Sequence, residues 1–97
     1  MLTKKEFCEA TVREEMASMG IENFEDAHNH IYASSTLAVC LEYLGVLTPE
    51  EKEYSSTRGG VFSTFEVWEG KQFKDVKFLT VREIISLLPE NMDEEKN

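Results

Sequence analysis

The sequence predicts a small α+β domain that is mostly helical. Two observations carry this prediction: a helix-start signal occurs three times, and one stretch rich in β-branched and aromatic residues spans residues 61–68. The chain has 97 residues, 41% of them hydrophobic, which is enough for one buried core. We therefore expect residues 1–90 to form a single acidic domain with three N-terminal helices, a β-hairpin and a C-terminal helix. Residues 91–97 are expected to be a flexible acidic tail.

The helix-start signal is a Leu, then a Thr, then a Glu three residues after the Thr. It begins at Leu2, Leu47 and Leu79. In this capping box the Thr hydroxyl accepts a hydrogen bond from the backbone amide of the Glu, and the Glu side chain accepts one from the Thr amide. In the second copy Pro49 takes the first helical position, where its missing amide hydrogen costs nothing. We expect a helix to begin at each copy.

The first two helices are expected over residues 4–19 and 24–44. Apolar side chains recur at helical spacing along the first, and Gly20 suits the left-handed conformation that ends a helix. Asn23 is the expected N-cap of the second. From Leu37 onward this second helix is apolar nearly all round, which is typical of a helix at the centre of a domain or at a subunit interface. We therefore expect a homodimer, in which a second copy buries the apolar excess. The alternative is a monomer in which the first helix, the last helix and the hairpin wrap this helix completely.

A short third helix is expected over residues 49–54. Residues 61–68 then predict a strand, and Gly70 marks the turn of a hairpin whose second strand spans 71–78. Three lysines in this last segment are spaced as on one face of a helix, which leaves a helix there as the alternative. The final helix is expected over residues 81–88, where Pro89 ends it.

Three helices followed by a hairpin form the outline of a winged helix, which binds DNA through its recognition helix. In this chain that helix would carry Glu50, Glu51 and Glu53 against Lys52 alone, and phosphates repel carboxylates. We therefore expect no direct DNA binding. A degenerate winged-helix transcription regulator remains an alternative.

The charge of the chain is −9, from 19 acidic and 10 basic residues. Most of the excess lies in the first 57 residues, which hold 11 acidic and 4 basic side chains. Five carboxylates gather where the first expected helix gives way to the second: Glu14, Glu15, Glu22, Glu25 and Asp26. Favourable placement at a helix N-terminus accounts for Glu25 and Asp26. The alternative is that the cluster is a binding face for a basic partner protein.

Phe62 and Trp68 complete the candidate partner-binding residues. They would share one face of the expected strand, and paired aromatics on a surface mark contact sites. The alternative is that the C-terminal helix covers this face.

No residue pattern points to catalysis, a cofactor or a membrane span. His28 and His30 are the only histidines, and two residues apart on a helix they point about 200° apart, too far to share one metal ion. Cys8 and Cys40 lie in apolar stretches, where thiols are inert and reduced.

These observations predict a small, acidic, non-enzymatic protein-interaction or regulatory module. Such a module, of the type that phages and mobile elements carry as accessory proteins, would bind or inhibit a basic partner protein in the cytoplasm. A small-ligand or metal-binding domain that uses His28 or His30 is a further alternative.

Overall fold

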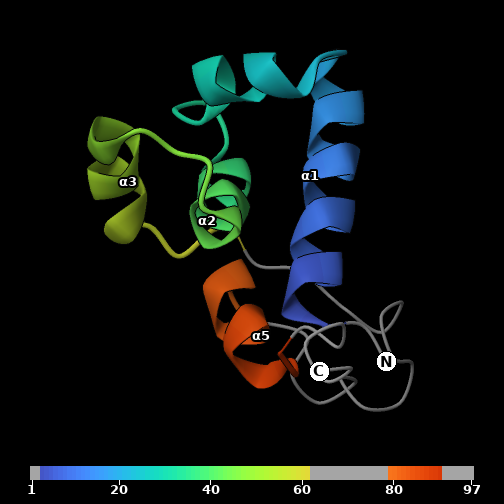
Figure 1. Ribbon diagram of the computed structural model, residues 1–97, viewed down its shortest axis with the longest axis vertical. Helices are drawn as coiled ribbons and strands as arrows, with labels where there is room; N and C mark the ends of the chain where they lie inside the picture. The colour runs from blue at the N-terminus through green and yellow to red at the C-terminus, as the bar shows by residue number, and fades with distance from the viewer. Residues whose placement is uncertain (1–2, 62–78, 91–97) are drawn as a thin grey trace, which may run out of the picture.

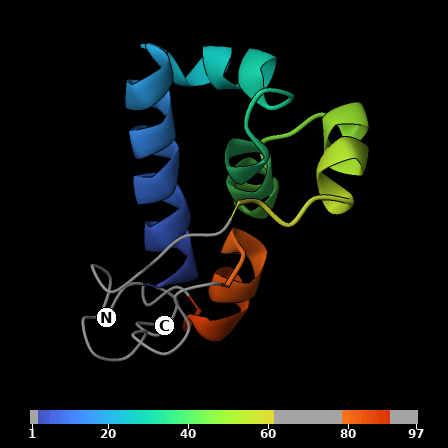
Figure 2. The same ribbon diagram turned by 180° about the vertical axis from the view of Figure 1, so that it is seen from behind.

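The computed structural model describes residues 3–61 and 79–90. Regular structure in these ranges begins with α1 (Lys4–Met19), the 3₁₀ helix η1 (Phe24–His30) and α2 (Ser35–Leu44), and continues with α3 (Pro49–Ser56) and α5 (Val81–Leu87). Helix α2 lies between α1 and α3, and η1 crosses the end of α1 (Figures 1 and 2). Helix α5 contacts both α1 and α2 near the start of α1. Because α2 contacts every other helix of the described part, it is the centre of the fold.

The expected α+β class is wrong. Every regular element in the two described ranges is a helix, and Val61, where the first strand was expected to begin, belongs to no strand. The winged-helix outline is withdrawn with the α+β class, because it requires the hairpin. The remainder of the expected hairpin, residues 62–78, lies outside the described residues, as does the expected tail, residues 91–97.

The three expected helix starts are confirmed, each with a complete capping box. At the first, the Thr3 hydroxyl accepts from the Glu6 amide at 3.2 Å and the Glu6 carboxylate accepts from the Thr3 amide at 2.9 Å. The ends expected for α1 are also confirmed, since it stops at Met19 and Gly20 follows with a φ of 75°. These boundaries follow from local chemistry, because side chains satisfy the otherwise unpaired amides of each first turn.

The single helix expected over residues 24–44 is wrong, because the chain divides it into η1, a turn and α2. Asn23 makes no side-chain capping bond. Ser34 is the N-cap of α2 instead, and its hydroxyl accepts a hydrogen bond from the Leu37 amide at 3.1 Å. The same hydroxyl donates to the Glu15 carboxylate on α1 at 2.8 Å. A serine bonded in both directions holds the backbone out of the helix at this point.

The hydrophobic core forms around α2, whose residues 36–41 are all buried within the single chain. Every helix except α3 adds fully or nearly fully buried apolar side chains. The main contributions are Phe7, Cys8 and Val12 from α1, Ala27 from η1 and Ile31 just after it, and Val81, Ile84 and Ile85 from α5. The apolar surface of α2 is therefore largely covered without a second copy. This weakens the reason for expecting a homodimer, which stays a prediction.

Two contacts close the fold at its ends. The Lys4 amide donates to the Pro89 carbonyl at 2.8 Å, and the Lys4 ammonium lies 3.6 Å from the Glu90 carboxylate. The first turn of α1 is thereby tied to the segment that follows α5.

The loop before the undescribed segment packs tightly on α5. The Gly59 carbonyl accepts from the Arg82 amide at 3.0 Å. Gly60 has a φ of +82°, and a Cβ atom there would lie 2.9 Å from the Cβ of Val81. Gly60 is thus required by a close approach between loop and helix, since only glycine takes this conformation freely and leaves this space.

Candidate functional site

Four of the predicted partner-binding carboxylates are exposed along the later part of α1, the turn after it and the first turn of η1, and we call this set the acidic corner. They are Glu14, Glu22, Glu25 and Asp26, and each is exposed. None of the four makes a side-chain hydrogen bond or ion pair with another described residue. Their charges therefore face solvent, where a basic surface can approach them.

The fifth predicted carboxylate, Glu15, has a structural role. It is half-buried and accepts the 2.8 Å hydrogen bond from Ser34 that ties α1 to the start of α2. Most other described carboxylates also stabilise the fold: Glu6, Glu51 and Glu83 complete capping boxes, and Glu42 and Glu90 bond side chains of other elements. The carboxylates of the acidic corner differ from these because none has a hydrogen-bond or ion-pair partner in the described fold, although Glu25 and Asp26 lie in the first turn of η1, where the helix dipole favours acidic side chains.

A groove of about 470 Å³ adjoins the acidic corner, and we refer to it as the Phe24 groove. Its apolar lining is Val12 and Met16 from α1, Phe24 from η1 and Leu44 from α2. Its charged lining is Glu9, Arg13 and Glu22. Phe24 is 42% exposed, although it is a large apolar side chain. Glu22 belongs to both features, so the groove and the corner are continuous.

The sequence did not identify Phe24, because its exposure depends on how η1 crosses α1. A signal was present in its position between Glu22 and the Glu25–Asp26 pair, which marks an aromatic side chain within an acidic surface. The predicted aromatic contacts, Phe62 and Trp68, lie outside the described residues.

A second group of exposed aromatic residues links the turn after η1 to α3. The rings of Tyr32 and Tyr54 have centroids 4.5 Å apart and are tilted by 60°. The Arg58 guanidinium lies over the Tyr54 ring, 4.3 Å from its centroid. Tyr32 is 59% exposed. Stacking and cation–π attraction account for this arrangement without a partner.

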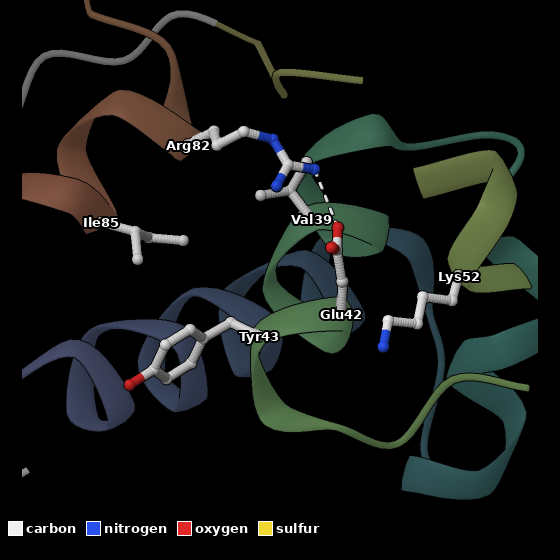
Figure 3. A pocket seen from close by; sticks show the side chains of 6 residues that line it. All are labelled: Val39, Glu42, Tyr43, Lys52, Arg82 and Ile85. Carbon is white, nitrogen blue, oxygen red and sulfur yellow. Dashed lines mark hydrogen bonds and ion pairs between the residues drawn. The ribbon is translucent and has the colours of Figure 1, made fainter. Parts of the chain in front are cut away.

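A smaller hollow of about 300 Å³ lies where α2, α3 and α5 meet (Figure 3). Figure 3 shows the Arg82 guanidinium directed at the Glu42 carboxylate, with the Lys52 side chain on the other side of Glu42. Arg82 donates at 2.8 Å to Glu42 and, at the same distance, to the backbone carbonyls of Ser55 and Arg58. The Ser55 hydroxyl donates to Glu42 at 2.7 Å. Arg82 and Glu42 are thus committed to joining three elements, whereas the Lys52 side chain makes no hydrogen bond or ion pair with another described residue.

The Glu42 pKa reflects this network. Partial burial raises the pKa, but the hydrogen bonds from Arg82 and Ser55 and the positive charge of Arg82 outweigh burial, so the pKa lies below its ordinary value. Glu42 is therefore a carboxylate held in its charged form, which suits an ion pair rather than proton transfer.

His28 joins η1 to α3 rather than facing His30. Its Nδ1 atom lies 2.9 Å from the Glu51 carboxylate. Desolvation raises the pKa of Glu51, but the Thr48 amide and His28 outweigh it and lower the pKa below its ordinary value. Within residues 3–61 and 79–90, no three His, Cys, Asp or Glu side chains are placed to hold one metal ion.

Cys8 and Cys40 are free thiols, and both are completely buried where α1 packs against α2. The pKa of Cys40 lies well above its ordinary value, first because of its hydrogen bond with Cys8 and next because of burial. The sequence-based expectation that these cysteines are reduced core residues agrees with this placement. Neither thiol has the exposure that a nucleophile requires, and the raised pKa of Cys40 also disfavours its thiolate.

No known protein family, curated protein or solved structure matches the chain. None of the helices in the described residues is long and apolar enough to cross a membrane.

Proposed function

We propose that this protein is a non-enzymatic interaction module that binds a basic partner protein in the cytoplasm through its acidic corner. One observation supports the proposal most strongly: Glu14, Glu22, Glu25 and Asp26 are all exposed, and none of their carboxylates has a hydrogen-bond or ion-pair partner among the described residues. Opposite charge accelerates the encounter of two proteins and fixes their relative orientation. The net charge of −9 extends this attraction beyond the corner itself.

The arrangement of the remaining charged groups supports binding rather than catalysis. Glu42 and Arg82 bond each other, His28 bonds Glu51, and the thiol of Cys40 is buried with a raised pKa. Each group is held in a state that stabilises the fold.

Affinity capture from the native host, with mass spectrometry, tests the proposal when it includes a matched pair of charge-reversal variants. Glu25→Lys/Asp26→Lys reverses two charges in the acidic corner. Glu50→Lys/Glu53→Lys reverses two charges on α3, where both carboxylates are also exposed. We expect the parent and the α3 variant to retain the same basic protein, and the corner variant to lose it.

Salt provides a second criterion, because the Debye length falls from about 10 Å at 0.1 M to about 3 Å at 1 M. Retention should therefore weaken steeply as salt is raised. Equal capture by the corner variant and the parent would contradict the proposal.

A further inference from the structure

We propose that the Phe24 groove receives an amphipathic helix of the partner, which is basic along one side and places a large apolar side chain between Met16, Phe24 and Leu44. This inference rests on the proposed function, because the groove adjoins the acidic corner and shares Glu22 with it. It goes beyond that function by specifying which kind of partner segment binds, namely an amphipathic helix.

The lining of the groove suits an apolar side chain of the partner. Val12 is buried at its floor, Met16 and Leu44 are half-buried, and the Phe24 ring is 42% exposed at the side. The volume of about 470 Å³ falls in the range of about 300–1,000 Å³ over which protein pockets hold ligands. Such a lining gains most from an apolar side chain, because each square ångström removed from water contributes roughly 25 cal/mol.

The charges in and beside the groove are complementary to a basic segment. Glu9 and Glu22 line the groove against the single cation Arg13, and Glu25 and Asp26 lie just beyond Glu22. Neither Glu9 nor Glu22 has a hydrogen-bonding or ion-pair partner among the described residues. Lysines or arginines on one side of the bound segment would meet these carboxylates while its apolar side faces Phe24.

A helix is the favoured form of the segment because of what surrounds the groove. The groove is walled by helices, and the described ranges contain no strand whose edge could pair with an extended peptide. A recurring way to fill a hydrophobic groove is with the apolar face of an amphipathic helix, whose anchors recur at positions i, i+3, i+4 and i+7.

The probe is a fluorescein-labelled peptide of Leu and Lys, about 14 residues long and thus about four helical turns, with all leucines on one face. A second peptide has the same composition but the leucines redistributed round the helix. Fluorescence anisotropy with the full chain, at about 0.15 M salt, measures both affinities. We expect the first peptide to bind at least about tenfold more tightly than the second, since both carry the same charge.

Two pairs of variants locate the site. Phe24→Ser should weaken binding of the amphipathic peptide about tenfold. Tyr32→Ser, which removes a more exposed aromatic ring outside the groove, should leave binding unchanged. Likewise Glu9→Gln/Glu22→Gln should weaken binding more than Glu50→Gln/Glu53→Gln, which removes the same charge from α3.

A measurement on the unmodified chain covers the case in which Phe24→Ser does not fold. In a spectrum of ¹³C-labelled methionine methyl groups, the peptide should shift the signal of Met16, which lines the groove. Met19, one turn along the same helix and outside the lining, is the internal control and should shift little.

The outcomes separate this inference from the proposed function. Equal affinity for the two peptides, or an unmoved Met16 signal, would overturn the groove assignment. The capture experiment with Glu25→Lys/Asp26→Lys would still decide whether the acidic corner binds a basic protein. Loss of capture in that variant together with equal peptide affinities would mean that the corner binds by charge alone.

Discussion

The Arg82 guanidinium lies 2.8 Å from the Glu42 carboxylate and joins the last described helix to the central one. Two further donors of the same side chain reach the carbonyls of Ser55 and Arg58, at the end of α3 and just beyond it. One planar side chain thus connects α2, the end of α3 and α5. The rigid fork of a guanidinium suits this role better than the point charge of an ammonium.

Arg82→Lys should lower the free energy of unfolding by about 1–2 kcal/mol, because a lysine cannot satisfy all three acceptors. Urea unfolding followed by circular dichroism measures the loss. Arg13→Lys is the matched control, since Arg13 is exposed and has no hydrogen bond or ion pair within the described fold. Equal unfolding midpoints for the two variants would show that Arg82 does not connect these elements in solution.

The stability of the protein should fall in acid partly through Glu42. The pKa of Glu42 is lower in the folded chain than its ordinary value of 4.5. Its contribution is therefore complete above the unfolded-state pKa and is lost as the pH falls through the lower folded-state pKa.

Glu42→Gln should accordingly reduce stability at pH 7 and flatten the loss of stability below pH 4.5. Thermal unfolding across a pH series measures both effects. Glu50→Gln, an exposed carboxylate on α3, should keep the acid slope of the parent. An unchanged slope in Glu42→Gln would argue against the ion pair.

Gly60→Ala should destabilise the fold by about 1–2 kcal/mol, because a side chain disfavours positive φ. In addition, its methyl group would approach the Val81 Cβ to 2.9 Å. Gly59→Ala is the adjacent control: a Cβ atom there meets Thr80 at an ordinary 3.6 Å. Thermal melts should place Gly60→Ala clearly below Gly59→Ala. The reverse order would mean that the loop does not pack on α5 as described.

Thr80→Ala should cost about 1 kcal/mol through loss of the N-cap of α5. The Thr80 hydroxyl accepts from the Glu83 amide at 3.2 Å, and the Glu83 carboxylate accepts from the Thr80 amide at 2.8 Å. Thr57→Ala, which removes an exposed hydroxyl bonded only to the Tyr54 carbonyl, should change little. Coincident urea curves for Thr80→Ala and the parent would be inconsistent with this cap.

The two thiols should react with a disulfide reagent such as dithionitrobenzoate only when the chain opens. Cys8 and Cys40 are both completely buried, and the raised pKa of Cys40 further suppresses its thiolate. At pH 8 without denaturant we expect almost no release of chromophore, and two equivalents in concentrated urea. The increase should follow the unfolding curve. Rapid reaction of the folded protein would place a thiol at the surface.

Signals confined to one helical turn predicted more of this fold than patterns spread over a whole segment did. The capping boxes at Thr3, Thr48 and Thr80 gave correct helix starts because the box depends only on residues within one turn. The break between η1 and α2 was missed, because the N-cap Ser34 has Leu37 instead of Glu at the third helical position and so lacks the box. Its hydroxyl is also bonded to Glu15, nineteen residues away, which no local pattern encodes.

The candidate site likewise has features that the sequence predicted and features that it could not predict. The exposure of the acidic residues at the corner followed from composition, since charged side chains are exposed in almost any fold. The sequence could not separate Glu15, which supports Ser34, from Glu14 beside it. It also could not place Phe24, Met16 and Leu44 around one groove, because three different helices supply them.

The hydrogen bond between the Lys4 amide and the Pro89 carbonyl means that the chain enters and leaves its described core at one pole. The acidic corner lies at the other end of α1, which at sixteen residues is about 24 Å long (Figure 1). Domains whose ends lie close together tolerate insertion into other proteins and circular permutation. A host protein can therefore carry this chain as an inserted loop while the acidic corner points away from both junctions.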